Sequence, residues 1–210
     1  MEDIRNVRLA PLKDSNYLKP FRFLYTQNGT PKSWDLLGVH DSVGIIIYNI
    51  TRKVLVLVKQ FRPAVYYSSV HPDNRKDTID TDKYPGSLGT TLELCAGIVD
   101  KNKSLLEIAR EEALEECGYD IPADKMEEIA TCRSGVGEQS ALFTVFFCEV
   151  TDDMKTGAGG GIENELIEIV EKTIPEMEEM MNSPGPLASP PGFLYAIMWF
   201  LHHKAGKYKN

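Results

Sequence analysis

The segment that most constrains how this chain folds runs from residue 95 to residue 120, CAGIVDKNKSLLEIAREEALEECGYD. Ser104 followed three residues later by Glu107 is a capping box, and Gly118 is a typical residue to end a helix. A helix from about Leu105 to Cys117 is therefore predicted. At about 100° per residue, one face of this helix carries its apolar side chains, which are Leu105, Leu106, Ala109, Ala113 and Cys117.

The adjoining face of the predicted helix carries Glu112, Glu115 and Glu116 at spacings of three and four residues. A charge run such as EEALEE is usually a solvated helix surface. Like charges at these spacings destabilise an isolated helix by about 0.2–0.5 kcal/mol per pair, so the cluster needs compensation. A hard divalent cation with oxygen ligands supplies it, and the carbonyl of Gly97, at the end of the preceding strand, adds a further ligand.

The charge balance limits the classes of partner. The 210 residues include 31 acidic and 23 basic ones, which gives a net charge of −8. This sign argues against a nucleic-acid partner, because such proteins neutralise phosphates with an excess of Lys and Arg. An anionic substrate would have to bind together with a metal ion. The length fits one domain with extensions.

No segment has the pattern of a signal peptide, and the longest apolar run, Phe193–Leu201, is too short to span a bilayer. The four cysteines, Cys95, Cys117, Cys132 and Cys148, form no CxxC pair. They are expected to be buried free thiols in a reducing compartment. A cytoplasmic location without a membrane partner is therefore expected.

The remaining pattern indicates an α/β protein with a mixed sheet. Asn28-Gly29 predicts a hairpin between strands at 21–27 and 33–39. Further strands are predicted at 42–49, 53–61, 91–97, 127–137, 141–151 and 166–172, and helices at 176–181 and 193–206. The polar segment 66–91 has no periodicity, which leaves a functional lid and a disordered loop as alternatives.

The spacing around the predicted helix resembles that of the Nudix hydrolases. Their pattern is Gly, five residues, Glu, seven residues, Arg-Glu, an aliphatic residue, any residue, Glu-Glu, any residue, Gly and an aliphatic residue. Counted from Gly97, the positions that match without a gap are Glu112, Ala113, Glu115, Glu116, Gly118 and Tyr119. Two positions depart from it, since Lys103 replaces the first Glu and Glu111 replaces the Arg.

In the family that Arg helps hold the metal-binding glutamates. Its replacement by Glu111 implies ligands that are less well oriented, and Glu111→Arg is expected to keep or raise activity. The segments VLVLVKQFRPAVY, SGVGE and GGGIENELIEIV further resemble the ADP-ribose and UDP-sugar pyrophosphatase branch of the family.

The resemblance implies a set of roles. The Gly97 carbonyl with Glu112, Glu115 and Glu116 would hold Mg²⁺, with Mn²⁺ as a substitute, and Glu116 is also assigned to catalysis. The general base is expected from the loop after GAGGG, where Glu163 and Glu165 remain alternatives, with Glu138 as the next candidate.

Substrate contacts are implied as well. A guanidinium can hold a diphosphate in bidentate fashion, which fits Arg62, although a surface salt bridge is the plainer interpretation of that residue. The resemblance places Arg62 at the substrate and Glu93 near the metals. It also implies that Trp34 stacks on the base, across a dimer interface where N-terminal strands are exchanged.

The expected fold is a Nudix-type α/β/α sandwich with a mixed sheet and an N-terminal β-strand extension. Residues 1–40 form the extension, used for dimerisation and base binding, and residues 41–210 form the hydrolase domain. The implied reaction is hydrolysis of a nucleotide sugar, with UDP-glucose giving UMP and glucose 1-phosphate. One alternative is an ADP-ribose or ADP-sugar pyrophosphatase that gives AMP. Another is a module that binds nucleotide sugar without turning it over.

Overall fold

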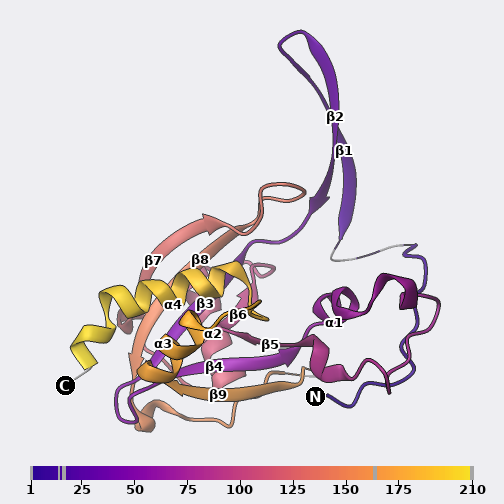
Figure 1. The fold of residues 1–210 in the computed structure, drawn as a ribbon. Helices are drawn as coiled ribbons and strands as arrows, with labels where there is room; N and C mark the ends of the chain where they lie inside the picture. Colours follow the sequence, from indigo (N-terminus) through magenta and orange to yellow (C-terminus); the bar gives the residue numbers. More distant parts are fainter. Residues whose placement is uncertain (1, 14, 16–17, 163–164, 209–210) are drawn as a thin grey trace.

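The computed structural model describes residues 2–13, 15, 18–162 and 165–208 (Figure 1). The strands are β1 (Lys19–Gln27), β2 (Thr30–Gly38), β3 (Ser42–Asn49), β4 (Val54–Phe61), β5 (Thr90–Glu93), β6 (Cys95–Ile98), β7 (Met126–Arg133), β8 (Leu142–Val150) and β9 (Ile167–Thr173). The helices are α1 (Pro63–Ser69), α2 (Leu105–Cys117), α3 (Ile174–Asn182) and α4 (Pro191–His203). The predicted bounds of α2 are confirmed, because Ser104 and Glu107 form the capping box and Gly118 takes a left-handed φ of 77°.

Seven strands form one mixed sheet in the order β5-β4-β3-β8-β7, with β6 beside β3 and β9 beside β4. β3 runs parallel to β8 and antiparallel to β4 and β6. Alternate residues of a strand face opposite sides of a sheet. Accordingly, Ile45 and Ile47 lie in the core beneath α2, whereas Ile46 and Tyr48 lie in the core beneath α3 and α4. Both faces are covered by helices, which confirms the α/β/α sandwich.

The segment 91–97, expected as one strand, is divided at Leu94. β5 pairs with β4, where Glu93 lies opposite Val58, and β6 pairs with β3, where Gly97 lies opposite Val43. The division occurs because β3 and β4 pair only over three residues each at their hairpin end. Beyond that point β3 and β4 are not paired with each other. Segment 91–97 therefore pairs first with β4 and, after Leu94, with β3.

β1 and β2 form a separate hairpin that extends away from the body of the molecule (Figure 1). Asn28 and Gly29 both take positive φ, at 52° and 75°. Two such residues are what a tight two-residue hairpin turn requires, so the Asn-Gly hairpin is confirmed. At the base of the hairpin, the backbone N–H of Leu37 donates to the carbonyl of Glu138 at 2.7 Å.

The polar segment 66–91 is not a disordered loop, and its use as a functional lid stays a prediction. It is folded into a small lobe whose core contains Tyr66, Val70 and Ile79, and Ile4 and Val7 of the N-terminal segment pack against it. Helix α1 opens this lobe. No periodic pattern marks this segment, because the lobe is built from short 3-10 turns and from contacts with a distant part of the chain.

The cysteines are all free, and Cys95, Cys117 and Cys148 are buried as expected. Cys132 is exposed, which corrects the expectation for that residue, because it lies on β7 at the edge of the sheet. Within the described ranges, no helix has both the length and the apolar character that a bilayer-spanning segment needs.

Candidate active site

A cavity of about 650 Å³ lies where β5, β6 and α2 meet the start of α4. It brings together residues that are far apart in the sequence. The residues predicted for the site that line this cavity are Arg62, Glu93, Gly97, Glu112, Glu116 and Glu165. Glu115 and Trp34 are not part of its lining.

Helix α2 presents Glu112 and Glu116 to the cavity because its apolar face is fixed on the sheet. Ala109 and Ala113 are fully buried there. Glu116 is only 4% exposed, and its Oε2 accepts a hydrogen bond from the backbone N–H of Ala96 at 2.9 Å. This bond joins the helix to β6, one residue before Gly97.

Gly97 allows β6 to approach α2 closely. A Cβ atom at this position would lie 2.2 Å from both Cδ and Oε1 of Glu112. A side chain at residue 97 would therefore displace the carboxylate of Glu112. The glycine of the sequence pattern is explained by this contact between backbone and carboxylate.

The environment of the two carboxyls disfavours their charged form. Burial raises the pKa of Glu112 to about 7, and the nearby Glu115 carboxylate adds to the shift. Burial likewise raises the pKa of Glu116 to about 7, against the hydrogen bond from Ala96. Glu116 is buried and Glu112 is partly buried, so a bound cation would favour the charged form of both carboxyls.

The donor set fits Mg²⁺ in its chemistry. Glu112, Glu115, Glu116 and the Gly97 carbonyl offer only oxygen atoms, which Mg²⁺ and Mn²⁺ prefer. Among the residues that the structure describes, no three His, Cys, Asp or Glu side chains converge around a single point where a metal ion would fit. The residues predicted as ligands thus lie on neighbouring positions of α2 and β6, and their side chains do not enclose a common point in this arrangement.

Arg62 and Glu93, which both line the cavity, form a bidentate pair. Nε and Nη2 of Arg62 each donate to Glu93 at 2.8 Å, and the hydroxyl of Thr91 donates to Oε1 of Glu93 at 2.6 Å. Burial opposes charge on Glu93, but the bonds from Arg62 outweigh it and the pKa of Glu93 lies below its usual value. The hydrogen bonds to Glu93 also raise the pKa of Arg62, so both groups stay charged.

The glycine run before β9 lies against the C-terminal end of α2. The N–H of Gly160 donates to the carbonyl of Glu116 at 2.8 Å, and that of Gly161 donates to the carbonyl of Glu115 at 3.1 Å. Gly159, Gly160 and Gly161 all take positive φ. As glycines they tolerate this left-handed backbone, which lets their N–H groups cap the last carbonyls of the helix.

The candidates for the general base occupy different places. Glu165 lines the cavity, and its Oε2 accepts a hydrogen bond from the N–H of Ile162 at 3.1 Å. Glu163 lies outside the described residues. Glu138 lines a second cavity of about 460 Å³ at the foot of the hairpin, away from the glutamates of α2.

Trp34 is not brought to the cavity of its own chain. It is 54% exposed on the hairpin, and its Nε1 donates to the carbonyl of Gly137 at 2.8 Å. A role for Trp34 in binding the base of a substrate in this cavity would require the hairpin of another copy. That role stays a prediction.

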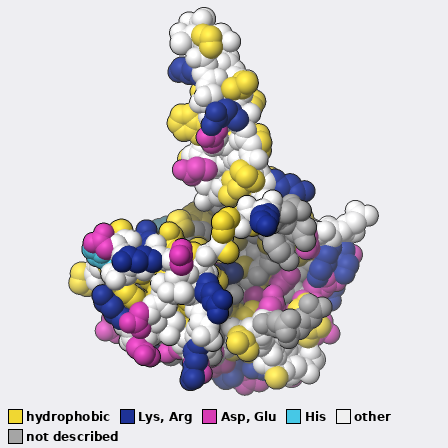
Figure 2. Space-filling view, turned by 90° about the vertical axis from the view of Figure 1, so that its right-hand side faces the viewer, with side chains coloured by type: hydrophobic (Ala, Val, Ile, Leu, Met, Phe, Trp, Pro, Cys, Tyr) yellow, Lys and Arg dark blue, Asp and Glu magenta, His cyan; other side chains and the backbone are white. Residues whose placement is uncertain are grey.

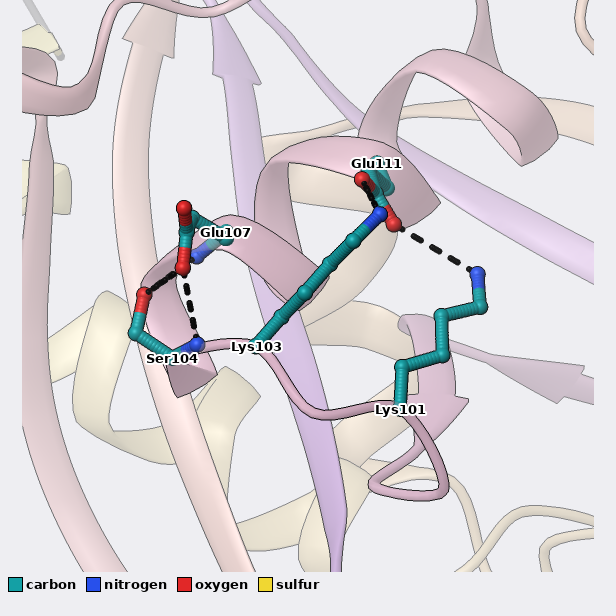
Figure 3. Close-up of polar contacts among 5 residues, drawn as sticks. All are labelled: Lys101, Lys103, Ser104, Glu107 and Glu111. Atoms are coloured by element: carbon teal, nitrogen blue, oxygen red, sulfur yellow. Dashed lines mark hydrogen bonds and ion pairs between the residues drawn. The ribbon is translucent and has the colours of Figure 1, made fainter.

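Glu111, which replaces the Arg of the Nudix pattern, has ion-pair partners of its own. It forms ion pairs with Lys101, at 3.4 Å, and with Lys103 (Figure 3). An Arg at this position would face two lysines, and the effect of Glu111→Arg on activity stays a prediction. The sequence contains both lysines, but it does not reveal that they pair with Glu111, because that pairing depends on the path of the loop before α2.

Sequence reasoning also missed one wall of the cavity. Tyr195 and Pro191–Phe193 from the start of α4, Phe143 from β8 and Arg133 from β7 line it. Gly192 lies close enough to Phe143 that a Cβ would come within 2.6 Å of the ring. The Pro-Pro-Gly sequence at the start of α4 was the available signal, since it marks a helix start and a close approach.

Comparisons with known proteins show that the chain is similar to nucleotide-sugar pyrophosphatases. The chain is 42% identical to the uridine diphosphate glucose pyrophosphatase of Mus musculus, over 95% of each chain, and 39% identical to that of Bos taurus, again over 95% of each. It is 31% identical to the GDP-mannose pyrophosphatase of Shigella sonnei, over 66% of this chain and 63% of that protein. No protein-family model matches the sequence.

A solved structure described as an ADP compounds hydrolase superposes with a TM-score of 0.65 over 99% of this chain and 95% of that one, at 14% identity, which shows the fold. The helix with its three matched glutamates, the sandwich fold and the two relatives at about 40% identity lead to one conclusion. The chain belongs to the Nudix hydrolases, in the branch of the ADP-ribose and UDP-sugar pyrophosphatases.

Proposed function

We propose that this enzyme hydrolyses the diphosphate bond of UDP-glucose and releases UMP and glucose 1-phosphate. The observation that carries the proposal is the cavity in which a guanidinium, Arg62, lies with the carboxyl groups of Glu112, Glu116 and Glu165. Such a set suits an anionic diphosphate bound with a divalent cation. The choice of UDP-glucose rests on the relatives in mouse and cattle, whose names specify that substrate.

Mg²⁺, with Mn²⁺ as a substitute, is the proposed cofactor. The Gly97 carbonyl and the carboxylates of Glu112, Glu115 and Glu116 would hold it. When bound, such an ion neutralises diphosphate charge and lowers the pKa of a bound water.

The chain's own groups have distinct tasks in this proposal. Arg62 binds the diphosphate, and Glu93 holds the guanidinium in place through two hydrogen bonds. Glu163 or Glu165 accepts a proton from water as its oxygen bonds to one phosphorus. The bond from that phosphorus to the bridging oxygen breaks, and the two phosphate monoesters leave.

We further propose a homodimer in which the hairpin contacts a second copy. Phe23 lies opposite Trp34 in the hairpin register, and Phe21 lies opposite Leu36, so these four side chains share one face. Phe21, Phe23 and Trp34 are each at least half exposed. Figure 2 shows the hairpin standing out from the body with apolar side chains along it. Such a patch is typical of a protein interface.

A cytoplasmic location is proposed because all four cysteines are free. Thiols persist in reducing compartments and tend to form disulfides elsewhere. Cys132 supports this most directly, because its free thiol is exposed and would persist in a reducing compartment.

A substrate panel tests the proposed reaction. The purified protein is incubated with Mg²⁺ and, in parallel, with UDP-glucose, GDP-mannose, ADP-ribose and ADP-glucose, and the nucleotide products are separated by ion exchange. We expect UMP from UDP-glucose as the fastest product. AMP as the fastest product would instead assign an ADP-ribose or ADP-sugar pyrophosphatase. Absence of any nucleoside monophosphate would assign a module that only binds nucleotide sugar.

A further inference from the structure

The two departures from the Nudix pattern are the two ends of one contact. Lys103 stands at the position of the first Glu and Glu111 at that of the Arg, and their side chains form an ion pair. The positive and the negative residue have therefore exchanged positions relative to the family pattern. Lys101 adds a second ammonium group to the same carboxylate, at 3.4 Å (Figure 3).

This group of three residues, here called the brace, attaches a loop to the middle of α2. The loop between β6 and α2 is held at its end by the capping box, in which Ser104 and Glu107 bond reciprocally. The brace attaches the same loop two turns further along the helix, at Glu111. Two attachments restrain the loop more than the capping box alone would.

The position of the brace matters because of its neighbours. Glu111 directly precedes Glu112, and the loop begins just after β6, where Gly97 lies against the Glu112 carboxylate. A change in the path of the loop would alter that contact.

We propose that the brace of Lys101, Lys103 and Glu111 positions the proposed metal-binding carboxylates of α2 by fixing the loop that precedes the helix. The proposal rests on the proposed metal site. Its members are between 32% and 43% exposed, so the ion pairs contribute little to overall stability. The effect is expected in metal affinity, where supporting residues typically change binding by about 10–100-fold.

The test is a reversal cycle that measures Mn²⁺ binding without substrate, by electron paramagnetic resonance of the free ion. Four proteins are compared: the parent, Glu111→Lys, Lys103→Glu with Glu111→Lys, and Glu111→Lys with Lys125→Glu. Lys125 is exposed and lies outside both the brace and the cavity. The last variant therefore makes the same change in net charge as the reversal without restoring the contact.

We expect Glu111→Lys to weaken Mn²⁺ binding about tenfold or more, because three ammonium groups then lie beside the carboxylates. Lys103→Glu should restore the affinity to within about threefold of the parent, and Lys125→Glu should not. The melting temperature of each variant should stay within about 4 °C of the parent. If Glu111→Lys does not fold, Glu111→Gln replaces it and is expected to weaken binding about threefold or more.

Unchanged Mn²⁺ affinity in Glu111→Lys would overturn the proposal, as would equal recovery by Lys103→Glu and Lys125→Glu, which would indicate net charge alone. A parent protein that binds no Mn²⁺ would instead contradict the metal site of the proposed function. The failure of the brace and the failure of the metal site are thus told apart.

Discussion

Neighbouring glutamates of α2 have different surroundings and are expected to respond differently to substitution. Glu116 is nearly buried and bonded to Ala96 on β6, Glu112 touches the backbone of Gly97, and Glu111 pairs with lysines at the surface. Three like charges that lie close together in the sequence therefore have different environments. Burial and partner, rather than residue type, distinguish them.

Glu116→Gln is expected to lower kcat by about a hundredfold or more, because the substitution keeps size and helix propensity but removes a charged oxygen ligand. Circular dichroism should show an unchanged fold. Steady-state kinetics at saturating Mg²⁺ measure the effect, and Glu107→Gln, in the capping box of the same helix, is the matched control. Near-parental activity of Glu116→Gln would remove Glu116 from the metal site.

The raised pKa values of Glu112 and Glu116 predict a pH dependence of the metal-free protein. Each is raised from 4.5 to about 7, so between those pH values the folded state binds more protons than the unfolded state. This contribution to the free energy of unfolding is fully present below about pH 4.5 and is lost as pH rises through about 7. Thermal unfolding in a chelator at pH 5 to 8 should therefore show a smaller loss of stability in Glu112→Gln with Glu116→Gln than in the parent. Equal pH profiles would contradict the shifts.

The loop between β8 and β9 contains glycines that contact α2 and an acid, Glu165, that lines the cavity. Gly159 approaches the carbonyl of Glu116 so closely that a Cβ would lie 2.4 Å from it. The loop is thereby fixed to the end of α2 beside the proposed metal ligands, and Glu165 on the same loop reaches the cavity. Docking of the loop on the helix places Glu165, a candidate base, at the cavity.

One of the two loop acids is expected to act as the general base. A base contributes to the chemical step more than to ground-state binding, so its loss should lower kcat and leave KM nearly unchanged. We expect one of Glu163→Gln and Glu165→Gln to lower kcat about a hundredfold or more and the other to have little effect. Steady-state kinetics on UDP-glucose measure both variants. Parental rates in both would leave Glu138 as the next residue to substitute.

The molecule as a whole consists of a sandwich body and a projecting hairpin (Figure 1). The hairpin exposes Phe21, Phe23 and Trp34, and in this chain Trp34 lies apart from the cavity lining. An arrangement of two copies would cover that apolar face and offers the route by which Trp34 could meet a substrate.

The protein is expected to sediment as a dimer, and Phe23→Glu should shift it to a monomer, because a charge buried in an apolar interface is costly. Arg22→Gln, on the opposite face of the same strand, is the matched control and should remain dimeric. Sedimentation equilibrium measures both. A parent that is monomeric at micromolar concentration would contradict the dimer.

Local signals were enough to predict α2 and its glutamates. Capping by Ser104 and Gly118 and the spacing of apolar residues act within a few turns, so the sequence predicted the helix bounds and the face on which Glu112 and Glu116 lie. The hairpin turn at Asn28-Gly29 was predictable for the same reason, since two positive φ angles are a local requirement.

Contacts between distant segments were decided by the fold. The division of 91–97 at Leu94 follows from where β3 and β4 stop pairing, and the bond between Arg62 and Glu93 joins residues 31 positions apart. The ion pairs of Glu111 with Lys101 and Lys103 depend on the path of one loop. Such contacts are set by strand register and loop course, which depend on the packing of the whole chain, and so no local pattern in the sequence specifies them.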